Sequence, residues 1–398
     1  MSDRKRRPAF ETPRSGIDGF AEDMKRTVDT IMRGRSLVYV RALNLLSEIV
    51  AGPARVEAVI AGLEQAWRKK SFNIYYHRPL LTLAALRAEA MAVDRHPLAR
   101  ALSTESPDAL AMTREALLDA LSPGRIGLWC ALATRSMQTN DVSRSVVWKW
   151  PAALAGCSSQ ARPLGLVDIG AAGGLNLIAD RLPLEWHQSS GARVAVATNP
   201  DVCLRVGFDV RPLDFNVDSD LAWARACIWA GDVHRMVQFD RAVSEWRVSD
   251  QLKASPVLRV VNATFVASKL PELLAKVPND GLLIVYQTLV RDYIENDKID
   301  RYETTMRRWI ASLPRGRAAW IELEAASGAR DRTSFDITAH VPDGRGGVQS
   351  ITLASTTSLP TMLDIQAQSA AEFSEAIRVH SIEGSPTGTR NYGHLKAV

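Results

Sequence analysis

The stretch that decides the fold is Leu166-Val167-Asp168-Ile169-Gly170-Ala171-Ala172-Gly173-Gly174-Leu175-Asn176-Leu177. Its first residues continue an apolar run that begins at Leu164, and a short run ending in glycine is typical of a buried parallel strand. The small residues predict a tight turn, and the amphipathic segment 174–181 predicts a helix. Ligands of open α/β sheets bind beyond the carboxyl ends of the strands. We therefore expect a ligand here to reach the backbone N–H groups at the start of that helix.

Short apolar runs and helical segments alternate after this turn. The predicted strands are 194–198, 202–210, 257–261, 282–286 and 318–323, and the predicted helices between them are 233–246, 270–277 and 300–312. This alternation predicts a doubly wound, Rossmann-like α/β sheet. Residues 333–341 and 348–355 alternate apolar with polar residues around a glycine-rich loop, which predicts an antiparallel hairpin at the carboxyl-terminal end of the sheet.

The amino-terminal part of the chain has a helical periodicity instead. Apolar residues recur at steps of three and four, as at Phe20, Met24, Val28 and Ile31. Proline and glycine separate several such segments. The chain therefore divides into three predicted parts, namely a disordered basic tail at 1–14, an all-helical cap domain at 15–155, and an α/β domain at 156–398.

Composition is that of an ordinary globular protein. Of 398 residues, 46% are hydrophobic and 23% charged, which excludes a disordered or fibrous chain. The net charge of +5 is small, and the one dense basic run, residues 4–7, lies at the terminus, so a nucleic-acid partner is not expected. No apolar run approaches the length of a membrane span, and no apolar signal segment follows the basic start. We expect a cytoplasmic protein that is not bound to a membrane.

Cysteine and histidine spacing carries no metal signal. The four cysteines form no C-x-x-C pair, and the seven histidines form no H-x-x-x-H or H-E-x-x-H pattern. We predict reduced, mostly buried cysteines and no metal site.

The glycine-rich turn fits one cofactor pattern better than another. A dinucleotide fingerprint, G-x-G-x-x-G, would need glycine where Ala172 and Leu175 stand. The turn resembles the first motif of class I S-adenosylmethionine methyltransferases, an acid and x followed by G-x-G-x-G, with alanine at the middle glycine. The resemblance implies that S-adenosylmethionine is the cofactor, and the residues it assigns to binding are Asp168, Gly170, Ala172, Gly173, Gly174 and Asn176. The alternative is a tight strand–helix turn that occurs in any α/β protein.

Three blocks of sequence resemble a large bacterial family, a domain of unknown function. They are 138–145 (QTNDVSRS), the turn 170–177 followed by Asp180 and Arg181, and 207–214 (GFDVRPLD) followed by Trp223, Ala226, Trp229 and Arg235. The resemblance spans roughly 135–325. It implies a fold similar to class I methyltransferases and leaves the reaction open.

The methyltransferase fold gives roles to the later strands. Strand 257–261 would be its fourth strand, ending at Asn262, where these enzymes often carry Asp or Asn facing the reacting methyl group. Strand 282–286 would be the fifth, and the hairpin 333–355 would supply the antiparallel sixth and seventh strands.

One element of that fold has several candidates, namely the acid that binds the ribose hydroxyls after the second strand. The predicted strand 194–198 ends at Asn199, with Asp201 just beyond. Asp209 is a better acid but lies 35 residues past Gly174. Asp209 or Asp214 binds ribose, or both line a substrate pocket, or both cap a turn.

Polar and aromatic side chains near these blocks are candidates for substrate binding. Asn and Gln side chains can fix an amide or carboxylate, and Arg can pair a carboxylate through two hydrogen bonds. The candidates are Gln138, Asn140, Arg144, Asp214, Trp229 and Arg235. Their alternative roles are to join the cap to the α/β domain, to fill the core, or, for Arg235 beside Asp232, to form a surface pair.

These features favour an enzyme that modifies a small molecule, by methyl transfer from S-adenosylmethionine. The helical cap would close over the substrate, and no catalytic base is assigned. One alternative keeps the fold without methyl transfer and catalyses another displacement, such as an intramolecular cyclisation with loss of a leaving group in secondary metabolism. Another is a non-catalytic binding or partner subunit, in a complex with another protein or as a homo-oligomer.

Overall fold

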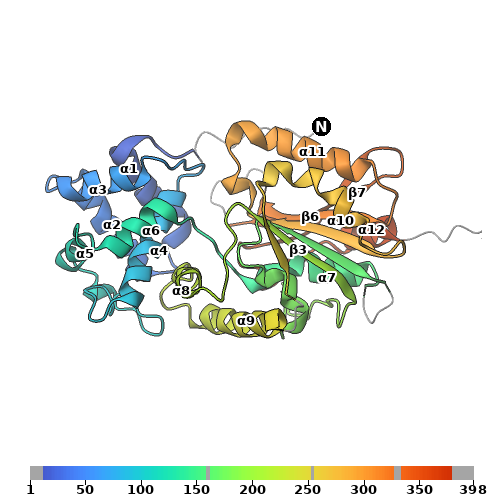
Figure 1. Ribbon diagram of the computed structural model, residues 1–398, viewed down its shortest axis with the longest axis horizontal. Helices are drawn as coiled ribbons and strands as arrows, with labels where there is room; N and C mark the ends of the chain where they lie inside the picture. Colours follow the sequence, from blue (N-terminus) through green and yellow to red (C-terminus); the bar gives the residue numbers. More distant parts are fainter. Residues whose placement is uncertain (1–11, 158–161, 252–254, 327–332, 379–398) are drawn as a thin grey trace, which may run out of the picture.

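The computed structural model describes residues 12–157, 162–251, 255–326 and 333–378. The predicted basic run at residues 4–7 lies outside the described residues. Figure 1 shows a group of helices beside a large sheet, which carries further helices on both of its faces.

Within the described residues, nine strands form one mixed sheet in the order β2-β9-β8-β7-β6-β5-β1-β3-β4. The bounds are β1 (Leu164–Ile169), β2 (His187–Gln188), β3 (Val202–Asp209), β4 (Val257–Val260), β5 (Leu282–Thr288), β6 (Ala318–Ala325), β7 (Phe335–Pro342), β8 (Val348–Thr356) and β9 (Met362–Ile365). Strands β4, β3, β1, β5 and β6 pair in parallel, and β6 to β9 pair antiparallel in succession. The chain is therefore α/β with a large, mostly parallel central sheet.

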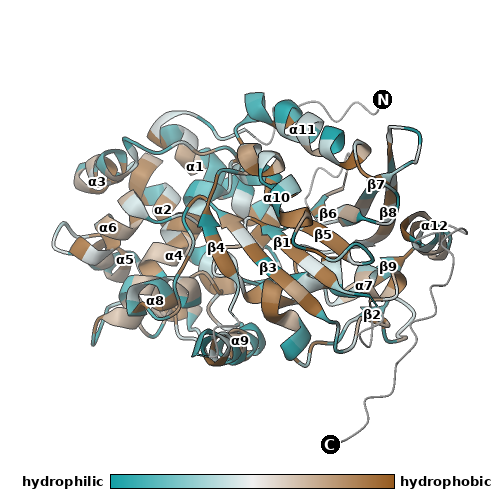
Figure 2. Cartoon of the chain, turned by 45° about the vertical axis from the view of Figure 1, so that its right-hand side comes forward, coloured by the Kyte–Doolittle hydropathy of each residue, from teal (hydrophilic) through white to brown (hydrophobic). Residues whose placement is uncertain are grey.

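The central strands are apolar because both of their faces are covered. Every residue of β1 is buried. Leu164 and Leu166 join the core on the face of α7 and α12, whereas Val167 and Ile169 join the core on the face of α10 and α11. Figure 2 shows these strands as a hydrophobic centre between more polar helices. A strand that is buried on both faces has a continuous apolar sequence rather than an alternating one.

The helices are of several lengths. The α-helices are α1 (Gly16–Thr27), α2 (Leu37–Ala51), α3 (Glu57–Trp67), α4 (His77–Ala92), α5 (Arg114–Ala120), α6 (Ile126–Thr134), α7 (Val146–Leu154), α8 (Asp218–Ala226), α9 (Val233–Gln251), α10 (Leu270–Leu274), α11 (Ile299–Ala311) and α12 (Ala367–Ile377). The short helices that bear on the site are η4 (Val142–Ser145), η5 (Leu175–Arg181), η6 (Ala263–Ser268) and η7 (Arg291–Tyr293).

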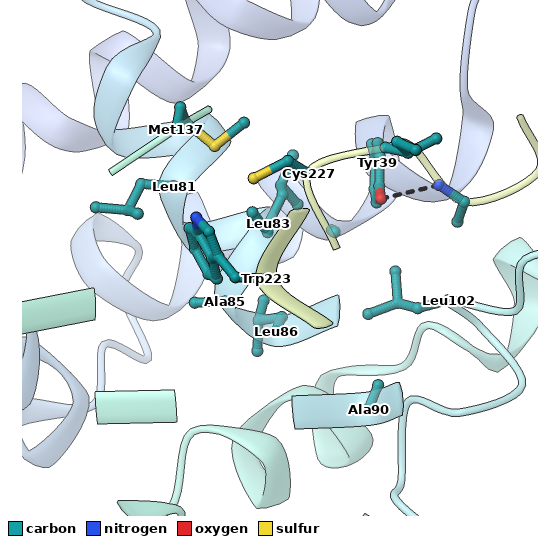
Figure 3. Packing of buried hydrophobic residues seen from close by; sticks show 14 of the residues in the cluster. Tyr39, Leu81, Leu83, Ala85, Leu86, Ala90, Leu102, Met137, Trp223 and Cys227 are labelled. Carbon is teal, nitrogen blue, oxygen red and sulfur yellow. Dashed lines mark hydrogen bonds between the residues drawn. The ribbon is translucent and has the colours of Figure 1, made fainter. Parts of the chain in front are cut away.

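The helical group includes a segment from the middle of the chain. Helix α8 packs against α4, and its Trp223 is only 2% exposed. Figure 3 shows Trp223 beside Leu83, Ala85 and Leu86 of α4. Its indole N–H donates to the carbonyl of Ser136 at 2.9 Å. The segment between β3 and β4 therefore shares a core with helices α1–α6, while the predicted domain division at 155 stays a prediction.

Several predicted elements are present with similar bounds. Strands β3 to β6 correspond to the predicted 202–210, 257–261, 282–286 and 318–323, and β7 and β8 form the predicted hairpin. The predicted helix at 174–181 is the 3-10 helix η5.

Two expectations about the strands are wrong. Residues 194–198 form no strand in the described chain, because the Val194 N–H donates to Trp186 and the Ala197 N–H donates to Lys149 rather than to a neighbouring strand. Strand 257–261 is also not the fourth strand beside β1, because β4 pairs with β3 at the edge of the sheet. That place belongs to β5, which pairs directly with β1.

Within the described residues, no helix is long and apolar enough to cross a membrane. The same residues contain no group of three or more His, Cys, Asp or Glu that could hold a metal ion. All four cysteines are free. Cys157 and Cys227 are buried, and Cys130 and Cys203 are exposed, so burial is less general than expected.

Candidate functional site

A cavity of about 1440 Å³ lies where the helical group meets the carboxyl ends of the parallel strands. Its sheet side is lined by 170–172 after β1, 208–211 at the end of β3, 261–264 after β4 and 288–290 after β5. Its helical side is lined by parts of 30–38, 70–81, 107–110 and 133–140. Ordinary small-molecule sites occupy roughly 300–1,000 Å³. The cavity therefore has room for more than one small molecule.

The cavity gathers most of the residues predicted from the sequence. Those that line it are Gln138, Asn140, Arg144, Gly170, Ala172, Asn176, Asp209, Trp229, Arg235 and Asn262. Those that do not line it are Asp168, Gly173, Gly174 and Asp214.

The backbone of the glycine-rich turn is already hydrogen-bonded. The N–H groups of Gly170 and Ala171 donate to Phe208, and that of Gly174 donates to Ala171. The two between them use side chains: Ala172 donates to Asp209 Oδ2 at 2.9 Å, and Gly173 donates to Asn140 Oδ1 at 3.1 Å. The N–H groups of residues 170–174 are therefore engaged within the chain, and the expectation that a ligand reaches the N–H groups at the start of the following helix stays a prediction.

The glycines of the turn are required by conformation and packing. Gly170 and Gly174 have φ of 79° and 78°, in the left-handed region that favours glycine. A Cβ on Gly173 would lie 2.1 Å from the ring of Phe215. Gly173 and Gly174 thus serve the packing behind the cavity. Ala172 has φ of 48° at the position of the motif's middle glycine.

Asp168 is buried inside the sheet rather than at the cavity. It is 2% exposed, and its carboxyl faces the Tyr286 side chain of β5. Burial raises the pKa of Asp168 well above its ordinary value, with the nearby charge of Asp209 acting in the same direction. Asp168 does not line the cavity, so a ligand there would not contact it directly.

Asp209 is the acid at the cavity. It ends β3, the strand that pairs with β1. Asp209 lies far from Gly174 in sequence because the segment 194–198 between them, which was predicted to be a strand, is not one. Its Oδ2 accepts from Ala172 N–H, and its Oδ1 accepts from Arg211 N–H at 2.8 Å. Burial raises its pKa, and these backbone N–H groups lower it. Asp214 lies outside the cavity and is exposed, where its carboxylate accepts from Asn216 N–H at 2.9 Å.

Asn262 lines the cavity at its edge-strand side. Its Oδ1 accepts from the N–H and hydroxyl of Thr264 at 3.0 and 2.9 Å and so caps η6. The role expected for Asn262 depends on 257–261 being the fourth strand of a methyltransferase sheet, whereas β4 is the edge strand and β5 pairs with β1. Asn176 also lines the cavity, and its side-chain oxygen is buried with no hydrogen-bond partner in the described chain.

Gln138 and Asn140 join the helical group to the sheet. Gln138 Nε2 donates to the carbonyl of Arg211 at 2.8 Å, and Asn140 Oδ1 accepts from Gly173. Trp229 packs edge-on against Tyr39, with ring centres 5.7 Å apart. Gln138 and Asn140 thus join the helical group to the sheet, and Trp229 packs in the core, as their alternative roles predict. All three residues also line the cavity.

Two arginines of the cavity wall differ in their partners. Arg235 is held by two carboxylates, Asp141 at 2.6 Å and Asp232 at 3.3 Å. Arg144 donates from Nε to the carbonyl of Ser358 at 3.0 Å.

Sequence reasoning missed a group of cavity residues on the helical side. The Tyr76 hydroxyl donates to Asp292 of η7. The His77 ring stacks on Tyr293, with centroids 4.6 Å apart. Burial lowers the pKa of Lys70 to about 8, with Arg211 acting in the same direction. More than 200 positions separate Tyr76 from Asp292, so no motif could have joined them.

Neither a search of curated proteins nor a search of solved structures found a match. A family profile described as "Uncharacterized protein conserved in bacteria (DUF2332)" matches residues 21–364. All residues that line the cavity fall within the matched part. The chain belongs to this family of bacterial proteins.

Proposed function

We propose that this protein is an enzyme that transfers a methyl group from S-adenosylmethionine to a small molecule in the cavity. The observation that carries the proposal is the place of Asp209, a half-buried carboxylate at the end of the strand beside β1, in contact with the glycine-rich turn and on the cavity wall. A carboxylate in that place resembles the acid that binds ribose hydroxyls in class I methyltransferases.

The order of the parallel strands supports this site. Taken in chain order, the five parallel strands lie in the order 3-2-1-4-5, so the connections reverse direction at β1. Ligands of open α/β sheets bind outside the carboxyl ends of the strands at such a reversal. The cavity lies there, and a methyltransferase-like sheet is the arrangement we propose for this part of the fold.

The groups present suit a ligand rich in hydrogen-bond donors. Asp209 has lone pairs left after its two backbone bonds, and the Asn176 oxygen has no partner in the described chain. Ribose hydroxyls and an ammonium group would satisfy these acceptors. The cofactor would supply an electrophilic methyl group, and the chain would supply alignment and exclusion of water. Lys70 also lines the cavity, and burial lowers its pKa to about 8, so it loses its proton more readily than an ordinary lysine does.

A second function has a specific observation in its favour. Asp168, Gly173 and Gly174 lie away from the cavity, and the N–H groups of the turn are occupied. These features suit an enzyme of the same fold that catalyses another displacement, such as a cyclisation with loss of a leaving group. A non-catalytic binding subunit is the remaining alternative.

The test is a calorimetric titration with S-adenosylhomocysteine and S-adenosylmethionine. Val210 follows Asp209, lines the cavity and is 63% exposed, so Val210→Trp fills part of the cavity without disturbing the core. Val237 on α9 is 61% exposed and lies off the cavity, so Val237→Trp is the matched control. We expect binding to the wild type and the control, and at least tenfold weaker binding to Val210→Trp.

Two results contradict the proposal. Absence of binding at millimolar concentrations would remove methyl transfer and favour the second function. Equal binding by Val210→Trp and Val237→Trp would place the ligand elsewhere. Gly174→Trp is a poor test, because the positive φ of Gly174 and the Leu258 side chain 3.1 Å from its Cβ position would disturb the fold itself.

A further inference from the structure

Arg144 is a buried cation on the wall of the cavity. It belongs to η4, at the junction between the helical group and the sheet, and it is 8% exposed. Its Nε is fixed on the carbonyl of Ser358, in the loop after β8. Among the residues that the structure describes, neither of its terminal nitrogens, Nη1 and Nη2, has a hydrogen-bond partner.

No carboxylate of the described chain neutralises Arg144 directly. The acid with the largest electrostatic effect on Arg144 is Asp141, whose Oδ2 pairs with Arg235 at 2.6 Å. The other oxygen of Asp141 accepts from Ser143 N–H at 3.0 Å and from the Ser143 hydroxyl. Burial lowers the pKa of Arg144, with Asp141 opposing and Arg235 reinforcing that shift. A guanidinium nevertheless stays protonated near neutral pH, so Arg144 is a buried cation whose charge Asp141 offsets in part and from which no described carboxylate accepts a hydrogen bond.

The other cations around the cavity are engaged or exposed. Lys70 donates to the carbonyl of Arg135, and Arg211 donates to that of Thr134. Lys298 pairs with Glu295 at 2.6 Å. The N–H groups of residues 170–174 are also engaged, so Arg144 is the buried cation of the described cavity wall that has terminal N–H groups left for an anionic group of a ligand.

We propose that Arg144 binds a carboxylate of the small molecule that occupies the cavity, through paired hydrogen bonds from Nη1 and Nη2. The planar fork of a guanidinium matches a carboxylate in this way, and such charge-assisted pairs are the stronger hydrogen bonds. A ligand carboxylate would supply the direct anionic partner that Nη1 and Nη2 lack among the described residues.

The proposal rests on the proposed function only in taking the cavity as the ligand site. The carboxylate has two possible sources, the amino-acid part of the methyl donor and the methyl acceptor. Both present the same chemistry to Arg144, and the experiment separates them.

The first arm measures thermal unfolding in sodium acetate and in sodium chloride at equal ionic strength. The variants are Arg144→Gln and, as the matched control, Arg35→Gln, which removes an exposed arginine from the same cavity. We expect about 200 mM acetate to raise the midpoint by about 1–3 °C in the wild type and the control, and by nothing in Arg144→Gln. Equal shifts in all three proteins would overturn the proposal.

Folding of the variant is itself informative. Because Arg144→Gln removes an unpaired buried charge, we expect the variant without ligand to be at least as stable as the wild type. Arg144→Lys keeps the charge but not the fork, so we expect it to retain less than half of the acetate shift. A full shift in Arg144→Lys would contradict paired hydrogen bonding.

The second arm compares S-adenosylhomocysteine with 5′-methylthioadenosine, which lacks the amino-acid carboxylate. If the donor supplies the carboxylate, Arg144→Gln weakens the first ligand at least tenfold and leaves the second unchanged. If the acceptor supplies it, both bind equally to wild type and variant, and the acetate shift persists at saturating S-adenosylhomocysteine. If neither nucleoside binds the wild type, the proposed function fails, while the acetate arm still decides on Arg144.

Discussion

At the scale of single residues, Asp209 connects the cavity to the glycine-rich turn. Its two oxygens accept one backbone N–H each, from Ala172 and Arg211, and its side chain also faces the cavity. The residue therefore has a structural role and a proposed binding role at once. The sequence indicated an acid at the end of an apolar run, but the N–H groups that this acid holds depend on how β3 lies against β1.

Replacement of Asp209 tests both roles. We expect Asp209→Ala to lower the free energy of unfolding by about 1–3 kcal/mol, because two N–H groups lose their acceptor. We also expect it to weaken S-adenosylhomocysteine binding at least tenfold. The control is Asp214→Ala, which removes an exposed acid outside the cavity and should leave binding unchanged. Urea unfolding and calorimetry measure the two effects, and a binding loss in Asp214→Ala alone would contradict the assignment.

Ala172 stands where the motif of class I methyltransferases has its middle glycine. Its φ of 48° costs an alanine roughly 1 kcal/mol. We therefore expect Ala172→Gly to raise the free energy of unfolding by up to about 1 kcal/mol, and Ala172→Val to lower it by about 1–3 kcal/mol. Urea unfolding checks both variants. If Ala172→Gly instead lowered the free energy of unfolding by more than about 1 kcal/mol, packing of the alanine methyl group would outweigh the backbone strain at this position.

At the scale of elements, the turn after β5 is held from the neighbouring strand. Oε1 of Glu324 on β6 accepts from the Gln287 side chain at 2.8 Å and from the N–H groups of Val290 and Arg291 at 3.0 and 3.2 Å. Leu289 within this turn has φ of 59°, a strained conformation for leucine. The turn lines the cavity, so Glu324 fixes part of the cavity wall from behind.

The carboxyl of Glu324 gives stability a specific pH dependence. Burial raises its pKa to about 7, with Arg291 opposing that shift. Because the folded pKa lies above the unfolded value, its contribution to stability is complete below about pH 4.5 and is lost as the pH rises through 7. Relative to the wild type, Glu324→Gln should therefore gain on the order of 2 kcal/mol between pH 4.5 and 7.5. Urea unfolding across that range measures it, and a constant difference would contradict the shifted pKa.

The elements also show what sequence can and cannot predict. Buried runs such as 282–286 were located because a strand covered on both faces is continuously apolar. The run 194–198 has the same apolar character but hydrogen-bonds to a loop and to α7, and a short run carries no sign of that difference. Because 194–198 was counted as the second strand, the strands that end at Asp209 and Asn262 were each assigned a position one too late in the parallel sheet.

At the scale of the whole molecule, the cavity depends on two groups of helices that are distant in sequence. Helix α8 packs on α4, and Trp223 is buried with residues of the amino-terminal helices (Figure 3). Such contacts between distant segments carry no local pattern. The sequence therefore indicates a helical part and an α/β part. It does not indicate that residues 218–226, from the α/β part, pack with the amino-terminal helices.

The shared core predicts that the α/β part is not independent. A fragment of residues 156–398 would expose Leu221, Trp223 and Met236, which are buried in the full chain. We expect this fragment to aggregate or to unfold without cooperativity, because that apolar surface loses its cover. Sedimentation and thermal unfolding of the fragment check it. A monomeric fragment with a sharp transition would support the division at 155 as a true domain boundary.

The most direct measurement of the central claim is amide hydrogen exchange with and without S-adenosylhomocysteine. The cavity is lined by 208–211, 261–264 and parts of 288–295, whereas the hairpin loop 343–347 is not part of it. We predict that the ligand slows exchange in the first three segments and leaves 343–347 unchanged. Binding with slowed exchange only outside the cavity, or no change at saturating ligand, would contradict the account.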